Sequence, residues 1–428
     1  MNNLTLKNNT LYIGGVSTLD LAYTYGTPLY VMDEDLIREN MRAFKKSFDN
    51  YYSGNGLVCY ASKAFCCLAV CRIAKEEGIG LDVVSAGELY TAVKADFDTS
   101  KILFHGNNKT LSELEYALEV GVGRIAVDNL SELEKLNAIA KNKNMIANII
   151  FRIKPGIDAH THDFVKTGQI DSKFGFALET GEAFEAVKRA LEYENIKLLG
   201  LHCHIGSQIM DTEPFTHAAE VMFSLIEKIK IELDYEIDDL NLGGGFGIKY
   251  LETDDFIQYD DYIRDCSKII AKITAEKGLK TPFILIEPGR SIVGPAGITL
   301  YTVGAVKNIP NIRKYVSIDG GMTDNPRYAL YQSKYEILCA NKASEPKTDI
   351  IALAGKCCES GDLIGMDLSL QKVAENDIIA VLATGAYNYS MSSNYNRIPK
   401  PPVVFVKDGK SRVVVKRETF EDIIRNDN

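Results

Sequence analysis

The sequence predicts a (β/α)8 barrel of the TIM type followed by a mostly β domain. Eight short apolar, β-branched segments, most of them separated by an amphipathic segment, indicate parallel strands that alternate with helices. Polar residues gather at or just after the C-terminal ends of these segments, which is where such barrels place their chemistry. After about residue 290 the strand-like segments continue with little helix between them, which indicates a second domain.

The eight predicted barrel strands are 57–61, 81–85, 102–106, 124–128, 147–153, 198–204, 239–245 and 283–289. We expect helices over 65–77, after Ser85, over 110–120 and over 129–141. Ser85 and Glu88 have the spacing of a capping box, as do Thr110 and Glu113. An open doubly wound sheet fits less well, because the glycine-rich segment at 243–247 does not match GxGxxG and follows the seventh strand rather than the first.

The C-terminal β domain is expected over residues 291–428. Its strand-like segments are 298–306, 313–321, 348–355, 377–385, 401–409 and 410–416, and the last two predict a hairpin that turns at Asp408-Gly409. Residues 1–26 contain one more strand-like segment, at 10–17, which we expect to pair with the β domain. The barrel is therefore assigned to residues 27–290.

The composition argues against several classes of protein. Hydrophobic residues make up 46% of the chain and charged residues 25%, as in globular proteins with a large core. No run of 18 apolar residues is present, so we expect no membrane span. The net charge of −10 argues against binding to nucleic acid. Nine cysteines, without the pattern of a secretory signal, are expected to be reduced thiols, which indicates a cytoplasmic protein.

Three groups of residues at the predicted strand ends could carry chemistry. Lys63 follows the first strand, where loss of hydration would favour the neutral amine that forms a Schiff base, although a surface lysine is the simpler explanation. Gly243–Gly245 could bring backbone N–H groups close to a phosphate, or could form a tight turn. Glu287 and Arg290 could bind a heteroaromatic nitrogen and a carboxylate, or could pair with each other.

Other candidate residues are less distinctive when taken singly. His202 and His204 would point to the same face of a strand, but two ligands do not make a zinc site, and we expect no metal. A histidine ring stacked on a flat cofactor, with Ser207 helping to bind phosphate, is the sharper alternative. Cys358 and Glu359 place a thiol beside a carboxylate, which indicates either a site loop or an ordinary turn.

Ten segments together give a more specific signal. They are TPLYVMDEDLIREN (27–40), YASKAF (60–65), FRIKPGIDAHTH (151–162), SKFGF (172–176), HCHIGSQ (202–208), LGGGFGI (242–248), EPGR (287–290), DGGMTDNPR (319–327), CESGD (358–362) and GAYNYSMSSNYN (385–396). In this order, and across nearly the whole chain, they resemble the fold-type III pyridoxal-phosphate decarboxylases, and among them the diaminopimelate decarboxylase branch.

The resemblance implies both an activity and an assembly. The expected reaction is decarboxylation of meso-2,6-diaminopimelate to L-lysine and CO2, the last step of lysine biosynthesis, through an external aldimine of pyridoxal 5'-phosphate. The expected assembly is a homodimer with active sites at the subunit interface. The fold that the resemblance implies, an N-terminal barrel and a C-terminal β domain, agrees with the pattern of strands described above.

The resemblance also implies residue roles. Lys63 would carry the cofactor, His204 would stack on its ring, and Glu287 would face its pyridine nitrogen. The residues similar to the phosphate-binding group of the family are Ser207, Gly243, Gly244, Gly245, Pro288, Gly289, Arg290 and Tyr387.

Substrate contacts are implied in the same way. Arg290, Arg327 and Tyr331 resemble the residues that hold the retained carboxylate, and Tyr387 resembles a residue near both phosphate and substrate. Cys358 and Glu359 match a loop that enters from the partner subunit. In that loop Cys358 would be the proton donor and Glu359 would bind the distal ammonium.

Related activities stay open at this point. The same fold serves decarboxylases of ornithine, arginine, D-lysine, D-ornithine and carboxynorspermidine, as well as racemases and cofactor carriers without catalytic activity. The CESGD segment favours diaminopimelate, because the ornithine and arginine branches usually have Asp where Glu359 stands. Arg327 and the same segment argue against a racemase, and the β domain argues against a carrier. Lys356 and Cys357 depart from the family pattern, which we expect to affect only the packing of the loop.

Overall fold

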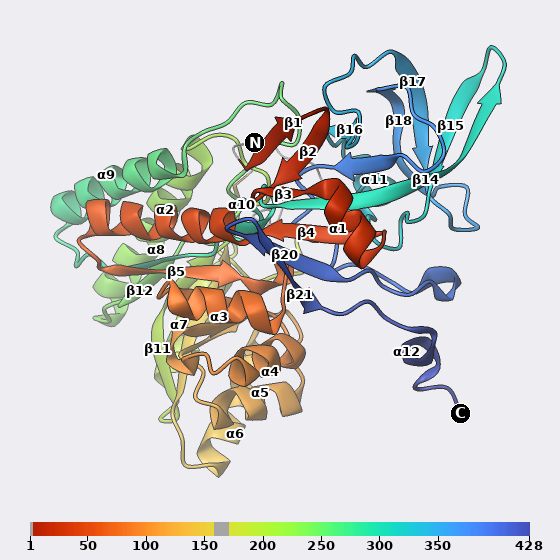
Figure 1. The fold of residues 1–428 in the computed structure, drawn as a ribbon. Helices are drawn as coiled ribbons and strands as arrows, with labels where there is room; N and C mark the ends of the chain where they lie inside the picture. Colours follow the sequence, from red (N-terminus) through yellow and green to blue (C-terminus); the bar gives the residue numbers. More distant parts are fainter. Residues whose placement is uncertain (1–2, 158–170) are drawn as a thin grey trace. The chain divides into compact units, whose positions relative to one another are not determined.

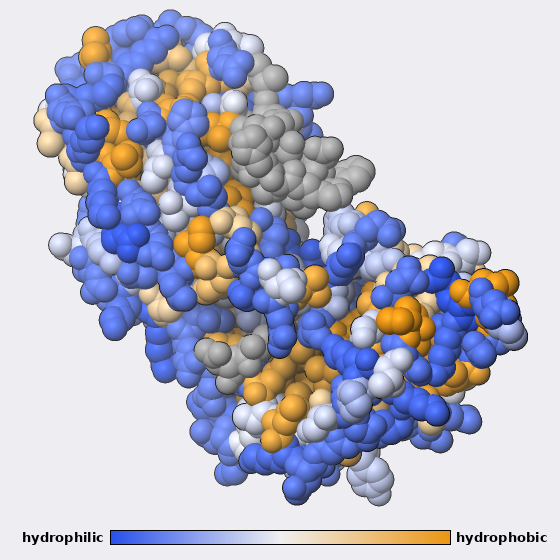
Figure 2. Space-filling view, turned by 90° about the horizontal axis from the view of Figure 1, so that it is seen from above, coloured by the Kyte–Doolittle hydropathy of each residue, from blue (hydrophilic) through white to orange (hydrophobic). Residues whose placement is uncertain are grey.

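The computed structural model describes residues 3–157 and 171–428. The chain divides into two compact units. The barrel unit comprises Asn40–Ile248 and Phe256–Ser291, and the β unit comprises Met1–Glu39, Lys249–Asp255 and Ile292–Asn428. None of the described helices is long and apolar enough to cross a membrane. On the face drawn in Figure 2, hydrophobic residues reach the surface in patches among hydrophilic ones, which is usual for a folded protein.

Eight parallel strands close into a ring in the barrel unit, which confirms the predicted barrel. In order around the ring they are β5 (Gly56–Ala61), β6 (Gly80–Val83), β7 (Ile102–Phe104), β8 (Arg124–Val127), β9 (Ala147–Lys154), β11 (Ile196–Cys203), β12 (Asp239–Asn241) and β13 (Phe283–Ile286). Pairing of β13 with β5 completes the ring. A short strand, β10 (Phe176–Ala177), pairs with β9.

The interior of the barrel is filled by side chains. Five strands contribute one buried residue each to an apolar cluster, namely Cys59, Leu103, Ala126, Ile150 and Leu285. Burial of such residues drives closure of the ring, since apolar surface removed from water contributes about 25 cal/mol per Å². The barrel is therefore a packed core, and chemistry is confined to its rim.

Helices flank the barrel strands. They are α3 (Leu68–Glu76), α4 (Ala86–Lys94), α5 (Leu111–Glu119), α6 (Leu130–Asn142), α7 (Glu182–Leu191), α8 (Glu213–Leu233) and α9 (Tyr259–Lys277), while α2 (Glu34–Tyr52) runs from the β unit into the barrel unit. Figure 1 shows α3, α4, α5 and α6 in succession along the barrel.

Thr110 and Glu113 form the predicted capping box. The Ser85 hydroxyl accepts from the Glu88 N–H, but the Glu88 carboxylate accepts from Ser62 and Val84, so the second predicted box is half formed.

The β unit contains a mixed sheet with the order β18-β17-β15-β14-β4-β20-β21. These strands are β4 (Leu29–Asp33), β14 (Gly297–Ile309), β15 (Arg313–Ile318), β17 (Asp349–Ala354), β18 (Leu363–Leu370), β20 (Val403–Lys407) and β21 (Lys410–Val415); β16 (Ile337–Cys339) and β19 (Ile378–Val381) pair with each other, and β19 also pairs with β14. All six predicted strands are present. The predicted hairpin is also present, with Lys407 opposite Lys410. Strands β16 and β18 were not predicted.

The N-terminal residues join the β unit through a different strand from the one expected. The segment at 10–17 forms β2 (Thr10–Ile13) and β3 (Val16–Ser17), and β2 pairs with both β3 and β1 (Leu4–Lys7) in a separate sheet. Gly14 and Gly15, both with positive φ, turn the chain back on itself between β2 and β3. The strand that pairs with β14 and β20 is β4, which lies within the range assigned to the barrel. All five of its residues are buried, as a central strand requires.

Three short helices lie in the β unit, namely α1 (Thr18–Tyr25), α11 (Arg327–Tyr331) and α12 (Phe420–Ile424), and α10 (Arg290–Val293) begins in the barrel unit and ends in the β unit.

Candidate active site

Lys63 lies just after β5, in a single 3-10 turn over Ser62–Ala64. Its side chain is 41% exposed, and its Nζ is 3.7 Å from Oδ2 of Asp82 on β6. The Asp82 side chain is completely buried, and neither of its oxygens has a hydrogen-bond partner among the described residues. Burial raises the pKa of Asp82, and the nearby His105 and Lys63 act against that rise. Lys63 is thus an accessible amine that lies against a buried carboxylate.

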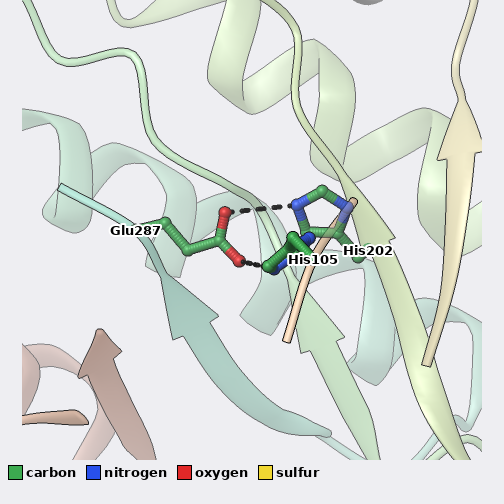
Figure 3. Close-up of side chains that lie close together, drawn as sticks. All are labelled: His105, His202 and Glu287. Atoms are coloured by element: carbon green, nitrogen blue, oxygen red, sulfur yellow. Dashed lines mark hydrogen bonds and ion pairs between the residues drawn. The ribbon is translucent and has the colours of Figure 1, made fainter. Parts of the chain in front are cut away.

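The Glu287 carboxylate lies just after β13, and the His105 and His202 rings lie beside its two oxygens (Figure 3). Its Oε1 is 2.7 Å from Nε2 of His105 and accepts from Nδ2 of Asn241 at 2.7 Å, while its Oε2 is 3.3 Å from Nε2 of His202. Burial by itself would raise the pKa of Glu287, but the two histidines hold that pKa well below its usual range. Burial also lowers the pKa of His202 to about 4, so this ring is neutral near pH 7. A charged carboxylate is therefore kept inside the barrel by hydrogen bonds.

The same three side chains bring potential metal ligands together. One ligand atom from each of His105, His202 and Glu287 lies within 4.8 Å of the others. Asn241, however, directs an amide N–H at the carboxylate, and an amide nitrogen is a donor rather than a ligand. A cation there would have to displace hydrogen bonds that already satisfy the carboxylate. The arrangement therefore fits a hydrogen-bonded anion better than a metal centre.

The glycine triplet after β12 is packed tightly against neighbouring backbone. A Cβ on Gly244 would lie 2.1 Å from the carbonyl oxygen of Glu287, and one on Gly245 would lie 2.4 Å from that of Gly206. Gly243 has a φ of +72°, and its N–H donates to Asn241. Only glycine fits this loop, because a side chain at any of these positions would meet neighbouring backbone.

His204 lies beside the glycine triplet. Its Nδ1 is 3.3 Å from the backbone nitrogen of Gly244. Burial lowers the pKa of His204 well below its usual value, and the positive charges of Lys63 and Arg152 add to that effect. The structure thus places a neutral, flat ring next to the loop that was expected to bind phosphate.

Ser207 and Arg290, two of the residues expected to bind phosphate, lie within hydrogen-bond distance of each other. The Arg290 Nη2 donates to the Ser207 hydroxyl over 2.9 Å. The alternative of an ion pair between Arg290 and Glu287 is not what the structure shows, because the carboxylate is held by His105, His202 and Asn241. Pro288 and Gly289 lie between Glu287 and Arg290 in the sequence. The Pro288 carbonyl accepts from the backbone N–H of Ala61, and Gly289 packs closely against Ala61. A guanidinium and a hydroxyl side by side are suited to a phosphate.

The other candidate residues lie in the β unit. Arg327, at the start of α11, is buried, and its guanidinium lies 4.7 Å from the centre of the Tyr250 ring and donates to the side chains of Tyr335 and Ser333. Tyr331 ends the same helix and is half-buried.

Tyr387 has a φ of +69°, which is rare for a residue with a side chain and is found at functional sites.

Cys358 and Glu359 lie on an exposed loop whose backbone is held by hydrogen bonds to neighbouring side chains. The buried Asp362 carboxylate accepts from the N–H groups of Met322 and Cys357. The Cys358 N–H donates to the Asn396 side chain, and both the Cys358 thiol and the Glu359 side chain are exposed. The loop therefore presents a thiol and a carboxylate at a defined place on the surface of the β unit.

Three residues of this site had no role assigned from the sequence. Asp82, His105 and Asn241 lie at the C-terminal ends of β6, β7 and β12 and connect with Lys63 or Glu287. The signal that could have found them is their position, because the C-terminal ends of all eight strands meet at one rim.

Comparison with known proteins places this geometry in a family. The family model described as "Pyridoxal-dependent decarboxylase, pyridoxal binding domain" matches residues 34–294. The chain belongs to the pyridoxal-dependent decarboxylases. Within this family it is 53% identical over 408 residues to the diaminopimelate decarboxylase of Bacillus methanolicus, covering 95% of this chain and 94% of that one. It is 50% identical to the diaminopimelate decarboxylase of Bacillus subtilis, covering 98% and 96%.

A solved decarboxylase structure has the same fold throughout. The diaminopimelate decarboxylase of M. jannaschii in complex with L-lysine is 36% identical, with a TM-score of 0.94, and the match covers 100% of this chain and 98% of that one. The family assignment thus extends over both units of this decarboxylase, including the C-terminal β domain beyond the matched pyridoxal-binding region.

Proposed function

We propose that this decarboxylase converts meso-2,6-diaminopimelate to L-lysine and CO2 and that it uses pyridoxal 5'-phosphate bound at the rim of the barrel. The observation that carries the proposal is the position of Lys63 and Glu287 after the paired strands β5 and β13, beside a glycine loop that tolerates no side chain. Relatives that share about half of their residues with this chain are diaminopimelate decarboxylases, and a similar structure holds L-lysine.

The side chains at the rim fit pyridoxal phosphate chemically. Lys63 is a reachable amine, and Glu287 is an ionised carboxylate suited to a protonated pyridine nitrogen. His204 is a neutral ring of the right shape for stacking. Ser207 and Arg290 form a pair suited to phosphate. The amine, the carboxylate, the flat ring and the guanidinium–hydroxyl pair suit the aldehyde, the pyridine nitrogen, the ring and the phosphate of the cofactor, in that order. This correspondence supports the assignment.

Bound pyridoxal phosphate supplies an aldehyde that takes up amines and a ring that accepts the electrons of the departing carboxylate. In this proposal Lys63 provides the resident amine and gives way to the substrate amine. Glu287 keeps a proton on the pyridine nitrogen, which maintains the ring as an electron acceptor. His204 orients the ring, while Ser207, the glycine triplet and the backbone of Pro288, Gly289 and Arg290 bind the phosphate.

Arg290, Arg327 and Tyr331 are proposed to hold the carboxylate that is retained, with Tyr387 near both phosphate and substrate. Among the described residues Arg327 has no carboxylate partner, since its side chain donates to a serine and a tyrosine hydroxyl. A buried guanidinium with only neutral partners can take a substrate carboxylate in a charge-assisted pair.

Cys358 and Glu359 are proposed to complete the site from the partner subunit of a homodimer. The exposed thiol would deliver a proton to the carbon that has lost CO2, and the exposed carboxylate would bind the distal ammonium. Their exposure on a loop fixed by Asp362 supports a role toward a second chain. All nine cysteines are free thiols, which supports a cytoplasmic setting.

A substrate panel tests the proposed reaction. Release of CO2 from meso-diaminopimelate, with L-lysine quantified, should exceed release from lysine, ornithine, arginine or their D-forms by about 10⁴-fold in kcat/KM, because buried polar partners would otherwise stay unpaired. Glu359→Asp is the matched control, since it keeps the charge but shortens the side chain. It should reduce the ratio of kcat/KM for meso-diaminopimelate to kcat/KM for the other amino acids. Equal turnover of the panel by the unsubstituted enzyme would contradict the substrate assignment.

Subunit mixing tests the shared site. Lys63→Ala and Cys358→Ala chains are each expected to be inactive, but random mixed dimers should recover about a quarter of the activity, because half of the dimers have one intact site. A Lys63→Ala/Cys358→Ala chain mixed with Lys63→Ala is the control and should recover none. Absence of recovery after proven subunit exchange would show that Cys358 serves its own chain or no site at all.

A further inference from the structure

We propose that His105 is a positioning residue that keeps the Glu287 carboxylate ionised and fixed in place. This inference deepens the proposed function and rests on it, because Glu287 is the group assigned to the pyridine nitrogen. His105 lies just after β7, and its role follows from its contacts rather than from any motif.

The His105 ring lies between two carboxylates. Its Nε2 is 2.7 Å from Oε1 of Glu287 and 4.0 Å from Oδ1 of Asp82. All three side chains are buried, at 4%, 5% and 0% exposure for His105, Glu287 and Asp82. The oxygens of an ionised carboxylate only accept, so an ionised Glu287 requires a hydrogen on the Nε2 that faces it. The proposal therefore predicts one tautomer, or the doubly protonated ring, and excludes a ring protonated only at Nδ1.

The contact belongs to a longer row of polar groups. Nζ of Lys63 lies 3.7 Å from Asp82, Asp82 lies 4.0 Å from Nε2 of His105, and the same Nε2 lies 2.7 Å from Glu287. Two buried carboxylates that faced each other directly would each favour the protonated form. The His105 Nε2 lies within hydrogen-bond distance of Glu287 alone and 4.0 Å from Asp82, so its hydrogen stabilises the charge of Glu287. His105 therefore contacts both the carboxylate beside Lys63 and the carboxylate assigned to the pyridine nitrogen.

A role in packing alone is the competing explanation. The His105 ring also packs against the His202 ring, with 4.6 Å between their centres and 59° between their planes. A side chain of similar size without a donor would preserve most of that packing but would leave Glu287 with one fewer hydrogen bond. The two explanations therefore predict different results for His105→Phe and His105→Gln.

Infrared spectroscopy of the cofactor-free protein distinguishes a role in packing alone from a role in keeping Glu287 ionised. In His105→Phe the buried Glu287 should take up a proton near neutral pH, because burial favours the uncharged form, and a carboxylic-acid band should appear. This band should be additional to any band of the unsubstituted protein, in which burial raises the pKa of Asp324 to about 7, and it should be absent from His105→Gln, which keeps an N–H donor. It should disappear in the double variant His105→Phe/Glu287→Gln. Asp239→Asn, which removes a buried carboxylate paired with Arg124 away from this cluster, is the control and should show no new band.

Kinetics of the loaded enzyme give a second readout. His105→Phe should lower kcat by about 10- to 100-fold with little change in KM, as expected when a hydrogen bond to a charged group is lost. His105→Gln should restore most of the rate. A merely structural role would make the two variants equally impaired.

Nitrogen NMR of the unsubstituted, cofactor-free protein keeps the proposal testable even if His105→Phe does not fold. The His105 ring should carry a hydrogen on Nε2. A ring protonated only at Nδ1 would overturn the proposal, and so would a foldable His105→Phe without the new band. If instead the unsubstituted protein bound no cofactor and released no CO2, the proposed function would fail, while the infrared comparison would still decide whether His105 controls the charge of Glu287.

Discussion

The charge of Glu287 depends on side chains from three different strands. His105, His202 and Asn241 lie at the ends of β7, β11 and β12 and converge on one carboxylate. The sequence predicted Lys63 and Glu287 because each follows a recognisable strand within a segment that resembles the family. It assigned no role to His105 or Asn241, because their partner is far away along the chain and no local spacing links them to it.

His202 provides a prediction at the scale of a single residue. Its folded pKa of about 4 lies below the ordinary value of 6.5, so the unfolded chain takes up a proton first as the pH falls. The contribution of the neutral His202 ring to the free energy of unfolding is complete above about pH 6.5. It is lost as the pH falls from about 6.5 to about 4. Nitrogen NMR of the cofactor-free protein should find this ring neutral at about pH 5. His202→Gln identifies the signal, and a midpoint at or above about pH 6 would contradict the account.

At the scale of the element, the loop after β12 is defined by backbone that leaves no room for a side chain. Gly244→Ala should destabilise the protein by about 2 kcal/mol or more and weaken cofactor binding, because its Cβ would meet a main-chain oxygen at 2.1 Å. Gly87→Ala in α4 is the matched control, since its Cβ would make only an ordinary contact at 3.7 Å, and it should be neutral or stabilising. Chemical denaturation and cofactor titration measure both effects. Equal stability of the two variants would show that the loop can relax.

Elements with a clear local pattern could be predicted, and elements defined by long-range contacts could not. The eight barrel strands are short apolar runs between helices, and Thr110 and Glu113 form the expected capping box. The Glu88 side chain instead accepts from Ser62, which lies 26 residues away. The capping box predicted from the spacing of Ser85 and Glu88 is therefore incomplete. Strand β16 has only three residues, and β18 contains Asp367 with a positive φ, so neither shows a regular alternation.

At the scale of the whole molecule, the sequence predicted the order of barrel and β domain but placed the N-terminal boundary imprecisely. Residues 29–33 precede the barrel helices and were assigned to the barrel, whereas β4 is a central strand of the sheet in the β unit. Residues 249–255 likewise belong to the β unit although they lie between barrel strands in the sequence. Apolar runs indicate that a strand is buried, but they do not reveal which sheet buries it.

The account as a whole depends on the amine that binds the cofactor. Purified protein loaded with pyridoxal phosphate, reduced with borohydride and cut into peptides should carry the pyridoxyl group on Lys63, and mass mapping identifies the modified peptide. Lys63→Ala should carry none. Lys109, which is buried and bonded to Glu132 and to two carbonyl oxygens, should stay unmodified in both. A pyridoxyl group found on another lysine, with Lys63 unmodified, would contradict the account.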